Sequence, residues 1–142
     1  MPRPGDCRIW ALITGVGIGA AFDALVMHRL LRWQLGLSDR SSGVISQGML
    51  DAAAVVLLLS GLTGLWVSKI GDLSRRVLTG AGLMGFGLWH VLDAGLSPGL
   101  HGQHDMGPHL PMLWQSAWII VFGLMPILIA RSLMSVEPDA AK

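Results

Sequence analysis

The sequence predicts an all-α integral membrane protein, and three observations support this fold class. Hydrophobic residues make up 52% of the 142 residues and charged residues only 13%, about half the share in ordinary soluble domains. The apolar residues fall into four blocks, each long enough for the roughly 20 residues that a membrane-spanning helix needs. None of the blocks has the charged outer face that a helix of a soluble bundle requires.

The four blocks define a single membrane domain over residues 1–142, in which the helices are expected to pack as a four-helix bundle. A histidine-rich outer loop is expected at 97–111. The expected transmembrane helices lie at approximately 9–31, 44–67, 77–96 and 112–131.

The basic residues predict which way these helices face. With four spans, both termini and the connection at 68–76 share one side of the membrane, and that side holds seven of the ten Lys and Arg residues. Cytoplasmic segments of membrane proteins carry the excess of Lys and Arg. We therefore expect both termini in the cytoplasm. The net charge of +1 provides no basic surface for nucleic acid.

Two stretches of the chain resemble each other. GVGIGAAFDAL at 15–25 is similar to GFGLWHVLDAGL at 85–96. At a shift of 70 residues, Gly15, Gly17, Asp23 and Ala24 recur as Gly85, Gly87, Asp93 and Ala94. This shift carries the first helix onto the third, which runs in the same direction. The pattern predicts two helical hairpins related by a parallel internal repeat, with a pseudo-twofold axis along the membrane normal.

Small residues at four-residue spacing mark the face on which each repeated helix packs. Such faces let helix backbones approach closely in lipid. The helix-packing positions are Gly15 and Gly19 on the first helix and Ala81 and Gly85 on the third. Asp23 and Asp93 continue these faces, so their carboxylates are expected to meet another helix rather than acyl chains. Glycine packing alone does not account for a carboxylate, which costs roughly 2.5–3.5 kcal/mol at the centre of a membrane helix.

Ionisable side chains gather in the outer halves of the helices and in the outer loop. Imidazole and carboxylate groups are common ligands of copper and zinc, so the sequence predicts a metal site on the outer face. Methionines at the same level favour copper, because thioethers suit Cu(I); they are Met27, Met49, Met106 and Met112. The candidate metal ligands are Asp23, His28, Asp51, His90, Asp93, His101, His104 and His109.

Each of these residues also has a structural interpretation. The loop histidines can be ordinary solvated side chains, and the methionines can be apolar packing. Asp23 and Asp51 can be protonated and hydrogen-bonded to neighbouring helices, because burial makes the neutral carboxyl accessible. Gln115, at the start of the fourth helix, is a natural polar partner for them.

GVGIGAAFDALVMHRLLRW at 15–33 resembles the opening of the bacterial membrane-protein family called domain of unknown function 2243. Asp23, His28 and Trp33 match its pattern, Asp51 and Asp93 match acidic positions of its second and third helices, and His104 falls near its late histidines. The chain departs from that pattern at Gln34, Leu35 and Ala52. The resemblance implies a multi-pass protein of the bacterial inner membrane and supplies no activity.

Three functions are compatible with these patterns. The first is a membrane protein that holds or passes on a metal ion, copper first and zinc second, without acting as an enzyme. The second is a proton- or ion-pathway component of a transporter, in which the three membrane aspartates form a relay. The third is a non-catalytic accessory subunit of a larger membrane complex. The expected partners are the lipid bilayer and either a second copy of the chain or other membrane proteins.

Overall fold

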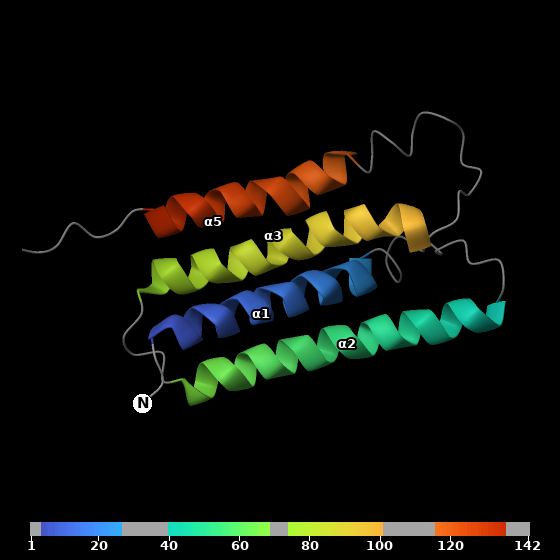
Figure 1. Ribbon diagram of the computed structural model, residues 1–142, viewed down its shortest axis with the longest axis horizontal. Helices are drawn as coiled ribbons and strands as arrows, with labels where there is room; N and C mark the ends of the chain where they lie inside the picture. Colours follow the sequence, from blue (N-terminus) through green and yellow to red (C-terminus); the bar gives the residue numbers. More distant parts are fainter. Residues whose placement is uncertain (1–3, 27–39, 69–73, 101–115, 136–142) are drawn as a thin grey trace, which may run out of the picture.

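The computed structural model describes residues 4–26, 40–68, 74–100 and 116–135, and these segments are almost entirely helical. The π-helical turn η3 runs directly into α5, so the elements form four rods (Figure 1). The elements are α1 (Pro4–Asp23), α2 (Arg40–Val67), α3 (Arg75–Leu100), η3 (Ile119–Leu124) and α5 (Met125–Ser135).

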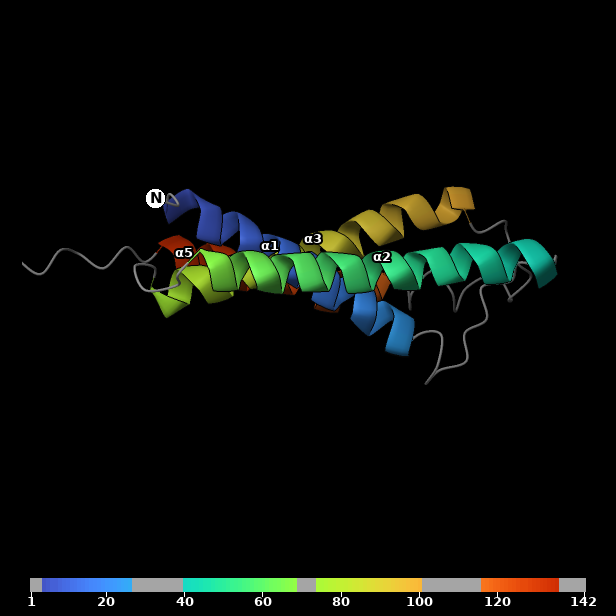
Figure 2. The same ribbon diagram turned by 90° about the horizontal axis from the view of Figure 1, so that it is seen from below.

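The rods lie side by side in the order α2, α1, α3, α5 (Figure 1). Within the described segments, α1 packs extensively on both α2 and α3, and α3 also carries η3 and α5. The extensive contacts of α2 are with α1 alone. The helices therefore form an open layer rather than the closed bundle expected from the sequence. The turned view shows α1 and α3 crossing at the centre of this layer (Figure 2).

The two central helices touch through their backbones. A methyl group added at Gly15 of α1 would overlap the carbonyl oxygen of Gly82 on α3, and one added at Gly85 would overlap the carbonyl oxygen of Leu12. Gly19 continues this contact one turn further along, against the side chain of Trp89. Small residues are what allows helices to approach this closely in a membrane. Glycine is therefore required at the crossing.

The 70-residue shift of the sequence recurs in these contacts. Gly15 on Gly82 and Gly85 on Leu12 are the same contact once the two helices are exchanged. The outer helices follow the same rule. Gly17 packs against Leu57 and Leu58 on α2, and its equivalent Gly87 packs against Ile127 on α5, which is the equivalent of Leu57. In the same way, Gly64 of α2 packs on Trp10 of α1. The equivalents of these two residues are Met134 of α5 and Gly80 of α3, and they also pack together.

Three of the four rods are long and apolar enough to span a membrane, as judged on the described residues: Cys7–Val26, Arg75–Gly95 and Ser116–Ser135. The described apolar stretch of α2 is shorter, at Asp51–Val67. Its 17 residues lie at the lower limit of the roughly 17–25 that can cross a bilayer. Among the described residues, α1, α2 and the rod of η3 and α5 each expose several large apolar side chains, whereas α3 exposes Leu92. Such exposed apolar surface suits contact with lipid.

Several helices extend beyond the expected bounds. α1 begins at Pro4, because proline has no amide hydrogen to lose in a first turn and its fixed φ suits a helix start. α2 begins at Arg40, and α5 continues to Ser135. α3 continues to Leu100, so the first four residues of the expected outer loop are helical. The start of α3 is capped by Ser74, whose hydroxyl oxygen accepts from the amide of Val77 at 3.4 Å.

The crossing predicts a large effect of one methyl group. Replacing Gly15 by Ala forces α1 and α3 apart, and we expect it to lower the free energy of unfolding by about 1–3 kcal/mol, the usual cost of overpacking. Circular dichroism during denaturant titration in detergent measures this change. Gly48→Ala is the matched control, because nothing lies within 4 Å of a methyl group at that position. Equal stability of the two variants would contradict the close contact.

Candidate functional site

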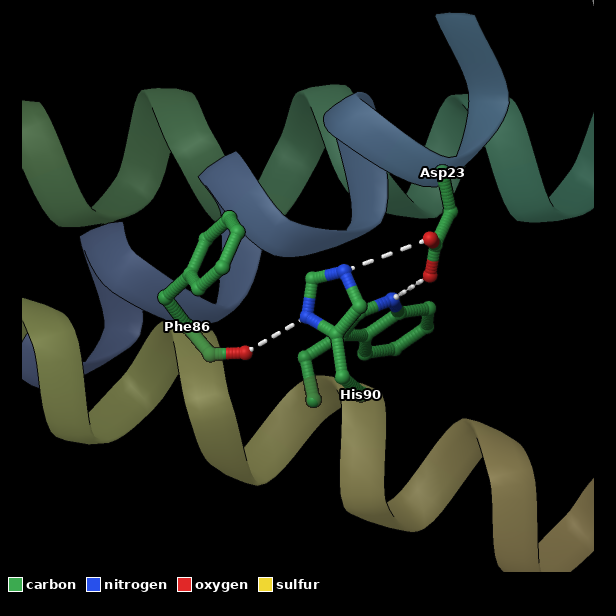
Figure 3. Close-up of polar contacts among 4 residues, drawn as sticks. Asp23, Phe86 and His90 are labelled. Atoms are coloured by element: carbon green, nitrogen blue, oxygen red, sulfur yellow. Dashed lines mark hydrogen bonds and ion pairs between the residues drawn. The ribbon is translucent and has the colours of Figure 1, made fainter. Parts of the chain in front are cut away.

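Asp23 and His90 meet between the two central helices. Asp23 is the last residue of α1, and His90 lies on α3 directly after Trp89, whose side chain packs on Gly19. His90 is 1% exposed and Asp23 is 9% exposed. His90 Nε2 lies 3.3 Å from Asp23 Oδ1 (Figure 3). The close backbone approach of α1 and α3 thus brings one imidazole and one carboxylate together inside the protein.

A hydrogen bond holds each side chain on the side that faces away from the other. The indole Nε1–H of Trp89 donates to Asp23 Oδ2 at 2.7 Å. His90 Nδ1 lies 2.9 Å from the carbonyl oxygen of Phe86, one turn earlier on α3 (Figure 3). A carbonyl oxygen can only accept, so Nδ1 must carry a hydrogen and donate it. In neutral His90 the lone pair is therefore on Nε2, the atom that faces Asp23.

The two facing atoms contact only each other. Asp23 Oδ1 and His90 Nε2 lie within ion-pair distance at 3.3 Å but without the geometry of a hydrogen bond, and neither has a hydrogen-bond partner within the described segments. An unsatisfied buried polar group costs about 1–3 kcal/mol. Two such atoms pointing at one another are therefore available for an ion or a shared proton.

Aromatic rings enclose His90. The ring of Phe86 lies closest, with its centroid 4.5 Å from that of the imidazole, and the rings of Phe22, Phe122 and Trp118 lie at 6.0, 5.8 and 6.2 Å. The side chain of His90 has no exposed surface, whereas 13% of the Asp23 side chain is exposed. Access to the pair is therefore from the Asp23 side.

Two π-helical turns border the site. Residues 24–26 take π-helical form immediately after Asp23, and η3 carries Phe122. The second turn has a cause in the sequence. Pro126 has no amide hydrogen for the carbonyl of Phe122, and its ring would clash with that carbonyl in an α-helix. The chain widens instead, and the amide of Met125 donates to the carbonyl of Ile120. Such turns are frequent at functional sites.

Of the other predicted ligands, the two that the structure describes, Asp51 and Asp93, do not join this pair in a ligand cluster. Asp93 is exposed and interacts electrostatically with His90. Asp51 is half-buried on α2, and Met49 is 69% exposed. The described residues contain no group of three or more His, Cys, Asp or Glu side chains that could hold a metal ion. His28, His101, His104, His109, Gln115 and the remaining predicted methionines, Met27, Met106 and Met112, lie outside the described residues.

Sequence reasoning missed the groups that orient and enclose the pair. Trp89 lies four residues after Gly85, on the packing face of its helix, but its hydrogen bond to Asp23 was not predicted. The sequence did contain a signal for this hydrogen bond, because the indole N–H of a tryptophan buried in a membrane helix needs an acceptor. The Trp118–Phe122 pair, with ring centroids 4.2 Å apart, could have been noticed as two aromatic residues four positions apart.

Comparison with known proteins gives one match. The model of a family described as "Predicted membrane protein (DUF2243)" matches residues 11–137, nearly the whole chain. Comparisons with curated proteins and with solved structures found no match. The matched region includes Asp23, Trp89 and His90.

The hydrogen bond between Trp89 and Asp23 predicts a specific loss of stability. Trp89→Phe keeps an aromatic ring against Gly19 but leaves Asp23 without its donor. We expect the free energy of unfolding to fall by about 1.5–3 kcal/mol, the range for a hydrogen bond to a charged group. Denaturant titration followed by circular dichroism measures it. Trp66→Phe is the control, because Trp66 is 85% exposed. If Trp66→Phe destabilises the protein as much as Trp89→Phe does, the hydrogen bond between Trp89 and Asp23 makes no specific contribution to stability.

Proposed function

Because this chain belongs to the DUF2243 family of predicted membrane proteins, we propose that it is a membrane protein that binds a divalent transition-metal ion, copper or zinc. Asp23 Oδ1 and His90 Nε2 are the proposed ligands. One observation carries the proposal: both atoms are buried, they lie within ion-pair distance of each other, and neither has a hydrogen-bond partner in the described segments.

Their separation fits two ligands of one ion. Zinc binds imidazole nitrogen at about 2.0–2.1 Å and carboxylate oxygen at about 2.0–2.2 Å. In a tetrahedral site these bond lengths separate neighbouring ligand atoms by about 3.3–3.5 Å. The Oδ1–Nε2 distance of 3.3 Å lies at the lower end of that range. An ion bound between the two atoms would therefore require little movement of either helix.

The hydrogen bonds behind the pair are also those of metal ligands. A metal-binding histidine usually donates its other ring N–H to a carbonyl or carboxylate, and ligating carboxylates are themselves hydrogen-bonded. The carbonyl of Phe86 and the indole of Trp89 make these two bonds. They fix the tautomer of His90 and the plane of Asp23, so that one atom of each side chain remains for the ion.

Two ligands do not complete a metal site, and the sequence indicates where the others come from. His28 follows α1, and three further histidines occur at His101, His104 and His109; we propose that they supply the remaining ligands. An imidazole and a carboxylate suit Cu(II) or Zn(II) better than Cu(I). The proposed role is to hold or pass on the ion, without enzymatic turnover.

The proposed topology has four spans arranged as two hairpins, with both termini in the cytoplasm. The recurrence of the helix contacts at a shift of 70 residues supports the two hairpins. Exposed arginines at one end of the layer, among them Arg8, Arg75 and Arg131, support a cytoplasmic location of that end. Asp23 and His90 then lie toward the periplasmic side of a bacterial inner membrane.

The proposal predicts metal affinity that depends on both helices. Isothermal titration of the purified protein with Cu(II) and with Zn(II) should show binding that Asp23→Asn and His90→Gln each weaken at least about 100-fold, since loss even of outer hydrogen-bond partners costs 10–100-fold. Asp93→Asn is the control, with the same chemical change at an exposed carboxylate. The proposal is disproved if the wild type binds neither ion. It is also disproved if the wild type and the three variants bind the ion with equal affinity.

A second candidate function is a proton-binding site, and the tautomer of His90 favours it. Nδ1 is engaged with the Phe86 carbonyl, so protons are exchanged only at Nε2, which faces Asp23 Oδ1. The pair can then share one proton between two helices. The sequence has no ionisable residue between Arg8 and Asp23 or between Arg76 and His90, so the pair would store a proton rather than form a continuous pathway.

Infrared spectroscopy tests this second function separately. Titration between about pH 4 and pH 9 should show the C=O stretch of a protonated carboxyl group that disappears in Asp23→Asn and titrates at a different pH in His90→Gln. Asp93→Asn removes a charge that acts on His90, so it should keep the band and shift its titration less than His90→Gln does. The candidate fails if the Asp23 band is absent throughout, or if its titration is independent of His90.

A further inference from the structure

A separate cavity lies at the opposite end of α1 from Asp23. It has a volume of about 160 Å³ between α1, α3 and α5. Its lining is almost entirely apolar, with Arg8 contributing mainly its aliphatic stem, so it lacks the two to four polar partners that a buried water needs. The lining residues are Arg8, Ile9, Leu12, Ala81, Met84 and Met134.

The cavity lies at the boundary of the membrane-spanning segments. The first span begins at Cys7, next to Arg8, and the span of α3 begins at Arg75. The span of α5 ends at Ser135, directly after Met134. Arg8 therefore lies at the depth of lipid headgroups, and the apolar lining extends from it into the hydrocarbon region.

The charged side chains that the structure describes at this end are all basic. Arg8, Arg75, Arg76 and Arg131 are all exposed, and no ion pair is found for them among the described residues. The acidic side chains that the structure describes, those of Asp23, Asp51 and Asp93, belong to the other half of the helices. These arginines beside an apolar groove are complementary to a ligand that has an anionic phosphate attached to a hydrocarbon chain.

We propose that this groove binds an anionic phospholipid, with its phosphate on Arg8 and an acyl chain against Leu12, Met84 and Met134. Basic residues near a membrane surface each contribute about 1 kcal/mol to binding of anionic lipid. The two methionines suit an acyl chain, because their flexible side chains adapt to irregular apolar partners. The site is independent of Asp23 and His90.

Electron spin resonance of spin-labelled lipids tests the proposal on the full chain in vesicles. Wild-type protein should immobilise phosphatidylglycerol about fivefold more strongly than phosphatidylcholine, the factor for about 1 kcal/mol. Arg8→Gln should remove this preference. Arg76→Gln is the matched control, with the same loss of charge at an exposed arginine that does not line the groove.

A second variant tests the groove itself. Ile9 is 58% exposed, so Ile9→Trp can fill the groove without disturbing the helix contacts, and it should also abolish the preference. Circular dichroism verifies that the variants keep the helical content of the wild type. The proposal is overturned if the wild type shows no preference, if Arg8→Gln and Arg76→Gln reduce it equally, or if Ile9→Trp leaves it unchanged.

Discussion

The backbone contact between α1 and α3 is the constraint on which the rest of the structure depends. Gly15 and Gly85 let each helix meet a carbonyl oxygen of the other. At this separation, side chains further along the crossing are forced to interact. The first is Trp89, which reaches both Gly19 and the carboxylate of Asp23. A wider crossing would leave Asp23 and His90 too far apart to face each other, and it would expose the carboxylate to lipid.

The scaffold is repeated, whereas the site occurs once. Asp23 corresponds to Asp93 at the 70-residue shift, and His90 corresponds to Ala20. A second copy of the pair would therefore join Asp93 to Ala20, which has no group to offer a carboxylate. Asp93 is accordingly exposed, and Asp23 is buried. A pseudo-symmetric packing thus supports an asymmetric pocket, with the aromatic rings of η3 and α3 gathered around its single histidine.

The sequence predicted the helices and one site residue on each central helix. The small number of charged residues and the length of the apolar blocks indicated a membrane protein. The family match over residues 11–137 confirms the resemblance seen in the motifs around Asp23. The open layer was not predicted, because composition does not tell which helices pack together. Asp93 was expected on the packing face of its helix, against another helix, but it is exposed. It lies about 60° around α3 from the buried His90, which is enough to place one side chain in the interior and the other at the surface. The π-helical turn at η3 depends on how the chain accommodates Pro126, which a count of apolar residues does not reveal.

A double-mutant cycle on Asp23 and His90 tests the central claim most directly. The free energy of unfolding is measured for the wild type, Asp23→Ala, His90→Ala and the double variant. If the two side chains meet in the interior as described, the single effects will not add, and the coupling energy will be about 1 kcal/mol or more. Effects that add within about 0.5 kcal/mol would show that the two residues act independently, and the site built on their contact would not exist.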